Sequence, residues 1–368
     1  MTTETQIEQA WQAAVSAVTG ERAVALAAQT AGTNGPVCVA AVGKAAPSMV
    51  LGLLAAGVEL KRALVVSKDG HSDERLSRMA EVRQLESAHP VPDQRSLQAG
   101  EELLQFVKDC TADEQLLLLV SGGASSLAEQ LVPGETLQSL QAKTQALLAA
   151  GADIAQINTV RRELSLIKGG KLAASCRAQL SSWMLSDVEG DEPMVIGSGI
   201  GVIADPSKQQ IIASNAIARE ATVESLQRDG LELQCNEESL YGDVNDVADR
   251  IAARLINGPV GAYVFGGEPT VVLPENPGEG GRNQALALAL GLRLAGTGVI
   301  GLVAGTDGTD GPTLAAGGWF GRHNPDSSAA VLALEAADAG RFLRESGQDF
   351  VTGPTGTNVM DILVAIKQ

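Results

Sequence analysis

Apolar residues occur in short runs along the first two thirds of the chain, and each run has the length of one strand. The runs are VCVAAV (37–42), ALVVS (63–67), LLLLVS (116–121) and WMLSD (183–187). Apolar positions at helical spacing are found from Lys44 onward and over 93–110, 135–150, 153–166 and 214–228. Continuous apolar strands that alternate with helices are typical of a parallel sheet covered on both faces. The pattern therefore predicts a three-layer α/β domain over residues 1–240.

The remaining residues, 241–368, predict a second and smaller α/β domain. AYVFGGEPTVVL (262–273) indicates two strands around a Gly-Gly turn, and a helix is expected from Arg282 to about Leu294. VIGLVAG (299–305) indicates a further buried strand, and the segment 236–257 is expected to be a helix that joins the two domains. A length of 368 residues fits two domains of ordinary size.

The charge balance narrows the choice of partners. Lys and Arg together number 27 against 44 Asp and Glu, which gives a net charge of −17. Nucleic acids and anionic membranes attract basic surfaces, so neither is an expected partner. The N-terminus lacks the basic region of a signal peptide, and no apolar stretch reaches the ~18 residues of a membrane span. We expect a cytoplasmic protein with four reduced cysteines; a homodimer is compatible with the sequence but not required by it.

Two segments are candidate anion sites. SGGASS follows the run LLLLV and places the hydroxyls of Ser121 and Ser125 beside the backbone of Gly122 and Gly123. Such a turn at a helix start can bind an anion, although an ordinary strand-to-helix turn has the same sequence features. Lys44, after the first strand, is suited to hold an anion as well.

The densest basic cluster lies in INTVRRELSLIKGGKLA (157–173). Its four cations are Arg161, Arg162, Lys168 and Lys171. A solvated helix face would explain them, but the acidity of the rest of the chain favours anion binding. His89, in HPVPD, is expected to have either a structural or a catalytic role.

Loop carboxylates and one arginine complete the candidate chemistry. Asp187 directly follows an apolar run, where a carboxylate can act as a base or hold a metal. GTDGTDGPT (305–313) places Asp307 and Asp310 in a Gly-rich loop, as hard oxygen ligands of Mg²⁺ would be placed, although Asp-Gly turns are also common. Arg282 begins a predicted helix behind two glycines, from which it could reach a phosphate.

Two common nucleotide-binding motifs are missing from the chain. Gly43-Lys44 is followed by Ala45, so GxxxxGK[ST] is not formed, and no GxGxxG opens a helix after the first strand. A dinucleotide fold of the usual kind is therefore disfavoured. Gly/Ser/Thr loops, isolated basic residues and loop carboxylates remain, and these suit phosphoryl transfer by positioning and electrostatic stabilisation.

The ordered set of motifs resembles the glycerate 2-kinases of the MOFRL family (DUF4147). The blocks are GKAA, HPVPD, LLLLVSGGASSL, INTVRRELSLIKGGKLA, LSDVEGDEPMVIGSG, GGEPTVV, GGRNQALAL, GTDGTDGP and TGPTGTNV. The resemblance implies a Rossmann-like N-terminal domain, a smaller MOFRL-type C-terminal domain and an active-site cleft between them. It also implies that ATP, with Mg²⁺, phosphorylates D-glycerate to 2-phosphoglycerate.

The resemblance also implies roles for individual residues. Those expected to be catalytic are Lys44, Asp187 and Arg282. Those expected to bind the substrate are Ser121, Gly122, Gly123, Ser125, Arg162 and Lys168. Those expected to bind the nucleotide are Lys44, Glu268, Arg282 and Asn358, and the expected metal ligands are Asp187 and Asp307.

Four positions depart from the family pattern. The serine loop of the family usually reads SGGGSAL, whereas here Ala124 stands in place of its third glycine and Ser126 in place of its alanine. Glu279 replaces a basic residue before Arg282, and Ala285 replaces an acidic residue after it. Two alternatives to the kinase remain. One is an oxidoreductase of the hydroxypyruvate reductase type, which the missing dinucleotide motif disfavours, and the other is a non-catalytic sensor of hydroxy acids or nucleotides, which Ala124 and Glu279 favour.

Overall fold

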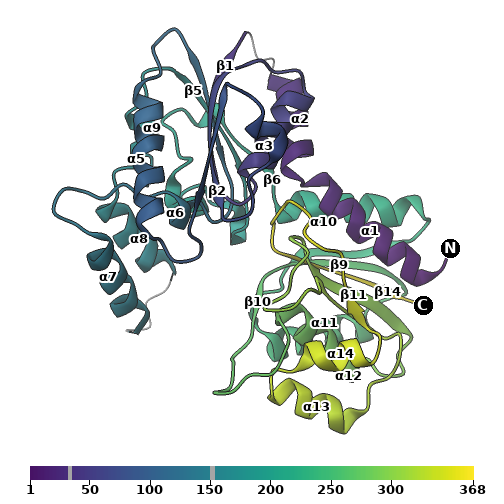
Figure 1. The fold of residues 1–368 in the computed structure, drawn as a ribbon. Coiled ribbons are helices and arrows are strands. Elements are labelled where there is room, and N and C mark those ends of the chain that lie inside the picture. Colours follow the sequence, from purple (N-terminus) through teal and green to yellow (C-terminus); the bar gives the residue numbers. More distant parts are fainter. Residues whose placement is uncertain (32–34, 150–153) are drawn as a thin grey trace. The chain divides into compact units, whose positions relative to one another are not determined.

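A computed structural model describes residues 1–31, 35–149 and 154–368 (Figure 1). Contacts among these residues group the chain into two compact units. The first unit is Thr19–Ser214, and the second combines Met1–Val18 with Asn215–Gln368. That residues 1–240 and 241–368 form separate domains stays a prediction.

The first unit is built on a six-stranded, fully parallel sheet with the strand order β3-β2-β1-β4-β5-β6. Its strands are β1 (Val37–Val42), β2 (Leu60–Lys68), β3 (Val82–Ser87), β4 (Gln115–Val120), β5 (Gln179–Leu185) and β6 (Gln209–Ala213). Every residue of β1 is buried, as expected for a continuous apolar strand between two helical layers. The strand order reverses between β1 and β4, the position at which open α/β sheets bind ligands.

Helices cover both faces of this sheet. They are α2 (Gly20–Ala31), α3 (Ala46–Ala55), α4 (Glu74–Ser77), α5 (Gln94–Lys108), α6 (Ala124–Leu127), α7 (Leu137–Ala149), α8 (Ile154–Leu164) and α9 (Lys171–Ala174), with short 3₁₀ turns at Glu189–Asp191, Ile196–Gly199 and Pro206–Lys208. Figure 1 shows α2 and α3 on one face of the sheet and α5 on the other, which confirms the three-layer prediction. The predicted helix ends at 150 and 153 lie outside the described residues.

The second unit contains a mixed sheet with the strand order β13-β12-β11-β14-β9-β7. Its strands are β7 (Leu233–Glu238), β9 (Gly261–Gly267), β11 (Val299–Gly305), β12 (Gly317–Phe320), β13 (Asp349–Phe350) and β14 (Asp361–Lys367). β7 pairs with β9 in parallel, and the other pairings are antiparallel. A two-stranded sheet joins β8 (Gly242–Asp243) to β10 (Pro269–Thr270). The two strands expected around the Gly-Gly turn are therefore present, but β10 pairs with β8 and not with β9.

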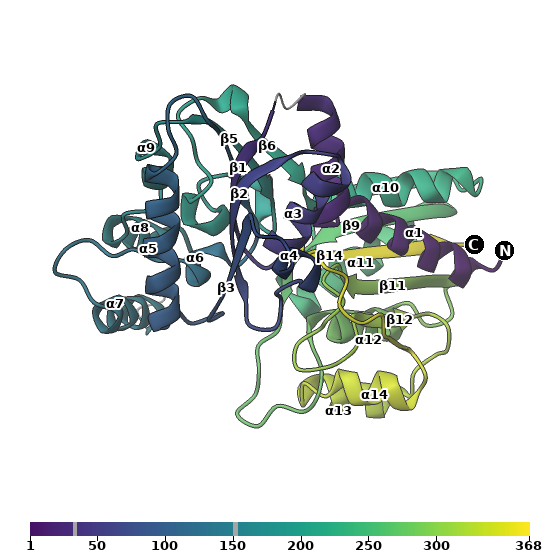
Figure 2. The ribbon, with the colours of Figure 1, turned by 45° about the horizontal axis from the view of Figure 1, so that its top comes forward.

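The helices of the second unit also form two layers. They are α1 (Thr3–Ala17), α10 (Asn215–Arg228), α11 (Val244–Asn257), α12 (Arg282–Arg293), α13 (Ser327–Glu335) and α14 (Ala339–Glu345). Figures 1 and 2 show α1 and α10 on one face of the mixed sheet and α11 and α12 on the other. The segment 236–257, predicted to be helical throughout, begins as the end of β7 and becomes helical at Val244.

Helix α1 is fixed to this sheet by its apolar side. Ile7, Ala10, Trp11 and Ala14 recur at helical spacing and are buried. The Trp11 indole Nε1 donates a hydrogen bond to the carbonyl oxygen of Ala304 in β11 (3.4 Å), and its ring meets that of Phe350 edge-on. The first helix of the chain is therefore part of the second unit.

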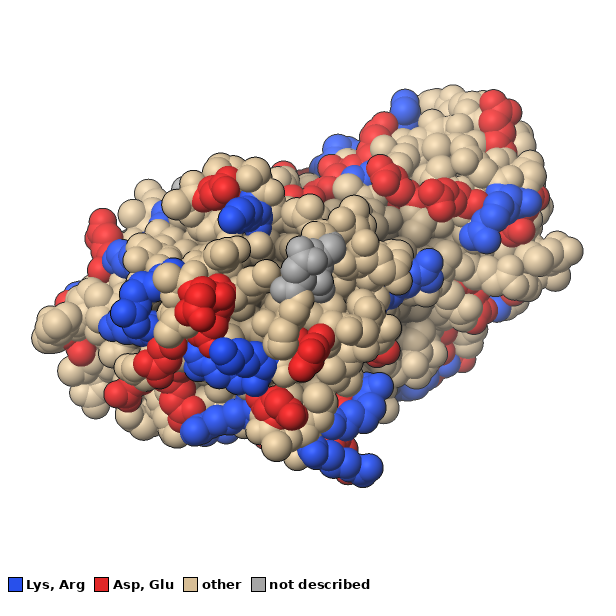
Figure 3. Space-filling model, turned by 90° about the horizontal axis from the view of Figure 1, so that it is seen from above, with Lys and Arg blue, Asp and Glu red and all other residues tan. Residues whose placement is uncertain are grey.

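The surface carries charges of both signs. On the face drawn in Figure 3, Lys and Arg side chains are scattered among Asp and Glu side chains. Among the described residues, no helix has both the length and the apolar character needed to cross a membrane.

Candidate active site

Hydrogen bonds join the loops after β1 and β4, at the point where the strand order of the first sheet reverses. The amide of Lys44 donates to the carbonyl oxygen of Gly122 (2.9 Å), and the amide of Ala45 donates to Oγ of Ser121 (3.1 Å). Gly43 has a φ of 136°, and a Cβ at this position would overlap Ser121. Only glycine allows this approach, which places Lys44 beside the serine-glycine loop.

Side chains from three strand ends surround the two glycines of that loop. A Cβ on Gly122 would overlap the Asp187 carboxylate, which follows β5. A Cβ on Gly123 would lie 3.1 Å from Nε2 of His89, which follows β3, and 3.2 Å from Cγ of Lys44. Among the described residues, the amides of Gly122 and Gly123 have no hydrogen-bond acceptor. The structure thus brings the predicted residues Lys44, Gly122, Gly123 and Asp187 together and adds His89.

The pKa values of two groups in this cluster differ from those of the same groups in water. Partial burial lowers the pKa of His89 to about 4, and the charges of Lys44 and Lys68 act in the same direction. The imidazole is therefore neutral at neutral pH. Burial raises the pKa of Asp187, and the positive charge of Lys44 only partly opposes this shift. A carboxylate with a raised pKa is better able to accept a proton from a substrate hydroxyl.

Ala124 does not crowd this loop, although its Cβ is a departure from the family pattern. The residue begins α6 without a positive φ, and its side chain is fully buried in the hydrophobic core of the first unit. A Cβ added to Gly197 would lie 3.0 Å from the Cβ of Ala124, which shows where the methyl group points.

The predicted substrate-binding residues Ser125, Arg162 and Lys168 have different surroundings. Oγ of Ser125 is hydrogen-bonded to Oγ of Ser198 (2.8 Å). Lys168 is fully buried and forms an ion pair with Glu129. Arg162 donates to Oγ1 of Thr159 (2.9 Å) and to the carbonyl oxygen of Met194 (3.4 Å). Ser125 and Lys168 line one cavity of the first unit, and Arg162 is not among the residues that line it.

Arg282 is the centre of a charge cluster in the second unit. Its guanidinium donates to both oxygens of Asp361, from Nε (2.6 Å) and from the NH2 nitrogen (3.1 Å), and its NH1 nitrogen pairs with Glu268 (2.6 Å). Asp361 is fully buried at the start of β14. The structure therefore joins the predicted residues Arg282 and Glu268, and it adds Asp361, whose only sequence signal is a carboxylate at the start of an apolar run.

The remaining predicted residues of the second unit lie in turns. Oδ1 of Asp307 accepts hydrogen bonds from the amide (2.9 Å) and the hydroxyl (3.0 Å) of Thr309. Oδ1 of Asn358 accepts from the amide of Met360 (3.3 Å), which has a φ of 68°. The other carboxylate oxygen of Asp307 is not used by this turn, so the side chain can still offer one hard oxygen to a cation.

Asp310 closes the N-terminus of α12. Its carboxylate accepts hydrogen bonds from the amides of Asn283 (3.1 Å) and Gln284 (2.8 Å). Burial nevertheless raises the pKa of Asp310 to about 7, because these amides and the charge of Arg282 offset only part of the desolvation. Both carboxylate oxygens are occupied, so Asp310 is a helix cap here.

This pKa predicts a pH-dependent stability. From about pH 4, where an unfolded Asp titrates, to about pH 7, the folded protein keeps a proton that the unfolded chain has lost. The free energy of unfolding should therefore fall as pH rises through this window, by at most about 1.4 kcal/mol per pH unit from this group. In Asp310→Asn, which mimics the protonated acid, urea unfolding should show a smaller fall. Parallel pH profiles for the two proteins would contradict the assignment.

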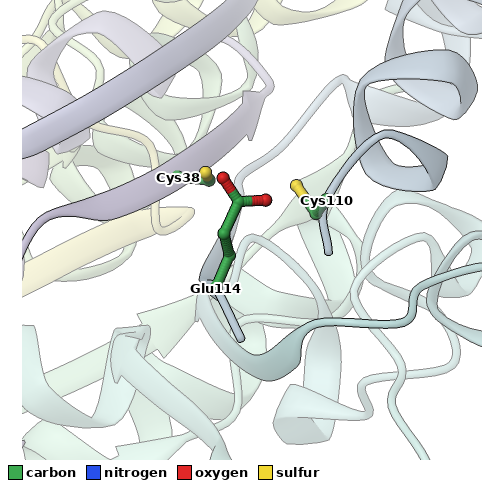
Figure 4. A group of neighbouring side chains, drawn as sticks. All are labelled: Cys38, Cys110 and Glu114. Carbon is green, nitrogen blue, oxygen red and sulfur yellow. The ribbon is translucent and has the colours of Figure 1, made fainter. Parts of the chain in front are cut away.

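One group of His, Cys, Asp or Glu side chains has the spacing of metal ligands, and it lies in the first unit, outside the candidate site. It is the only such group of three among the described residues. Figure 4 shows Cys38, Cys110 and Glu114, whose potential ligand atoms lie within 4.8 Å of one another. Glu114 is paired with Lys61 (2.8 Å), and Arg62 donates to the Cys110 sulfur (3.2 Å). Positive groups already occupy the directions from which a cation would be bound, so this group does not indicate a metal site.

Comparisons with known proteins identify the family. Residues 6–229 match the profile described as a domain of unknown function (DUF4147), and residues 261–361 match the profile of the MOFRL family. A Thermotoga maritima protein named D-glycerate 2-kinase is 35% identical in an alignment of 380 positions that covers 90% of each chain. A Pyrococcus horikoshii protein named glycerate 2-kinase is 30% identical, and the alignment covers 90% of this chain and 88% of the relative.

A solved structure extends the similarity to the whole fold. The crystal structure of a glycerate kinase from Thermotoga maritima superimposes with a TM-score of 0.88 at 30% identity and covers 99% of both chains. The fold and these relatives thus define an α/β enzyme of the kinase class. The chain belongs to the DUF4147 and MOFRL family, and its predicted resemblance to the glycerate 2-kinases is confirmed.

Proposed function

We propose that this protein transfers the γ-phosphate of ATP to the 2-hydroxyl of D-glycerate in a Mg²⁺-dependent reaction. The observation that carries the proposal is the convergence of Lys44, Asp187, Gly122 and Gly123 at the reversal point of the parallel sheet, where no described residue accepts from the two glycine amides. The names of the relatives supply the substrate class. A small-molecule substrate in the cytoplasm, without nucleic-acid or membrane partners, also agrees with the net charge of −17.

The residues of the first unit would bind and activate the reacting groups. The Lys44 ammonium and the two glycine amides would stabilise the negative charge of the transferred phosphoryl group. Asp187 would take the proton of the attacking hydroxyl, which its raised pKa favours. His89, neutral at neutral pH, would contribute a hydrogen bond without adding charge.

The residues of the second unit would bind the nucleotide. Arg282, whose guanidinium is fixed by Asp361 and Glu268, would donate its remaining N–H groups to a phosphate. Asn358 would assist, and Glu279 would not interfere, because it is paired with Arg344 (2.9 Å).

Asp307 is the residue of the second unit that would hold Mg²⁺, and Asp187 of the first unit would hold the ion in place of its role as base, not in addition to it. The ion needs only one or two protein carboxylates when phosphates and water complete its coordination, and Asp307 has one carboxylate oxygen that its turn does not use. Bound Mg²⁺ would neutralise charge on the phosphates.

The test is ADP release with ATP, Mg²⁺ and D-glycerate, followed by phosphorus NMR of the product. A signal from 2-phosphoglycerate that disappears when EDTA is added is the expected result. Formation of 3-phosphoglycerate would correct the position of transfer. Oxidation of NADH by hydroxypyruvate, with no ADP release, would replace the kinase with a reductase.

A further inference from the structure

The first unit contains a cavity of about 420 Å³ beside the serine-glycine loop. The segment Pro90–Pro92, which comes directly after His89 in the sequence, forms one wall of the cavity. Helix α6 forms another wall through Ser125. The residues that line it are Pro90, Val91, Pro92, Ser125, Glu129, Leu140, Gln141, Thr144, Gln145, Arg161 and Lys168. His89 contacts Gly123 and is followed by Pro90 of the cavity wall. The cavity is therefore adjacent to the cluster that contains Lys44 and Asp187.

Arg161 lines this cavity and has no ion-pair partner among the residues that the structure describes. The side chain is partly buried, and the guanidinium makes no hydrogen bond to another described residue. Burial lowers the pKa of Arg161, with only partial compensation by the charge of Glu129. An arginine with free donors in a partly dry wall matches a carboxylate, which can accept two parallel hydrogen bonds from it.

Glu129 provides a hydrogen-bond acceptor in the wall of the same cavity. It is fully buried, its Oε2 atom is paired with Lys168, and its Oε1 atom has no hydrogen-bond partner. A buried carboxylate oxygen without a donor is costly, and a ligand hydroxyl at the cavity would satisfy it. Because Lys168 is committed to Glu129, the cation left to meet an anion in the cavity is Arg161.

We propose that this cavity is the acceptor-substrate site, in which Arg161 binds the carboxylate of a hydroxy acid and Oε1 of Glu129 accepts a hydrogen bond from one of its hydroxyls. The proposal rests on the proposed kinase function, and it names the substrate class from the cavity alone: one carboxylate and at least one hydroxyl. It assigns the carboxylate to Arg161, whereas the neighbouring Arg162 bonds to Thr159 and Met194.

Calorimetric titration with D-glycerate, without nucleotide, tests the role of Arg161. In Arg161→Met, binding should weaken by about 10- to 100-fold, the loss expected for charge-assisted hydrogen bonds. Lys143→Met is the matched control, because Lys143 on the neighbouring α7 pairs with Glu135 (2.7 Å) and does not line the cavity. Glycerol, which lacks the carboxylate, should not bind the wild type. In kinetic assays Arg161→Met should raise KM for glycerate and leave KM for ATP unchanged.

Glu129 is tested by a comparison of two ligands. The wild type should bind D-glycerate more tightly than propionate, which has the carboxylate without hydroxyls, and Glu129→Leu, which removes the acceptor, should reduce this preference. Because that variant leaves Lys168 buried without its partner, the double variant Glu129→Leu with Lys168→Met is measured as well. An unchanged preference in the double variant would overturn the role of Glu129.

The outcomes separate this proposal from the kinase itself. If the wild type phosphorylates D-glycerate and Arg161→Met binds it normally, or if only Arg162→Met loses binding, the cavity is not the acceptor site although the kinase stands. If D-glycerate binds in an Arg161-dependent manner without turnover, the site stands and the kinase fails. If the wild type does not bind D-glycerate at all, the proposal is overturned.

Discussion

Lys44→Ala is expected to lower kcat by about 10²- to 10³-fold, the range observed when one preorganised group that stabilises transition-state charge is removed. The Lys44 side chain passes beside Gly123, and its charge acts on Asp187, so its loss removes positive charge from the site. The fold should survive, because the side chain forms no ion pair with another described residue and the amide that donates to Gly122 is unchanged. ADP release and thermal unfolding measure the two effects.

Lys108→Ala is the control for Lys44→Ala, since Lys108 is an exposed lysine at the end of α5 in the same unit. It should retain normal kcat. A near-normal kcat in Lys44→Ala, with the melting temperature unchanged, would exclude Lys44 from the active site.

Arg282→Met should reduce both activity and stability. The substitution leaves the fully buried Asp361 carboxylate without its partner and removes the proposed phosphate ligand. We expect a loss of about 3 kcal/mol in the free energy of unfolding, the lower end for a broken buried pair, because about a third of the Arg282 side chain is exposed. Urea unfolding measures this loss, and ADP release should fall by at least about 10²-fold.

A second substitution separates the two roles of Arg282. Adding Asp361→Asn removes the unpaired charge, so the double variant should recover most of the stability while remaining inactive. Recovery of activity in the double variant would show that Arg282 acts only by balancing Asp361. A single variant as stable as the wild type would contradict the buried pairing.

The first unit could be predicted well from the sequence because its strands are continuous apolar runs. VCVAAV, for example, corresponds to β1 over the same six residues. The loops after β1, β4 and β5 could also be expected to meet, since the carboxyl ends of parallel strands lie on one edge of a sheet. Lys44, Gly122 and Asp187 were identified on this basis, and the structure places them together.

Side-chain direction could not be predicted in the same way. Arg161 and Arg162 are adjacent and of one type, so the sequence does not say which of them faces a cavity. In the structure Arg161 lines the cavity, whereas Arg162 donates to Thr159. Glu129 carries no motif, and its partner Lys168 is 39 residues away. Likewise the apolar stripe of α1 shows that one side is buried but not which sheet covers it.

The assignment of α1 to the second unit has a consequence for biosynthesis. In sequence, the whole first unit is inserted between α1 and α10, the two helices that cover one face of the mixed sheet. A ribosome therefore releases α1 first but completes the strand β14, on which it packs, last. The inserted unit can collapse while translation continues, whereas the nascent amphipathic N-terminus must wait for nearly the entire polypeptide. Until then the apolar side of α1 that carries Trp11 has no native surface to bury it.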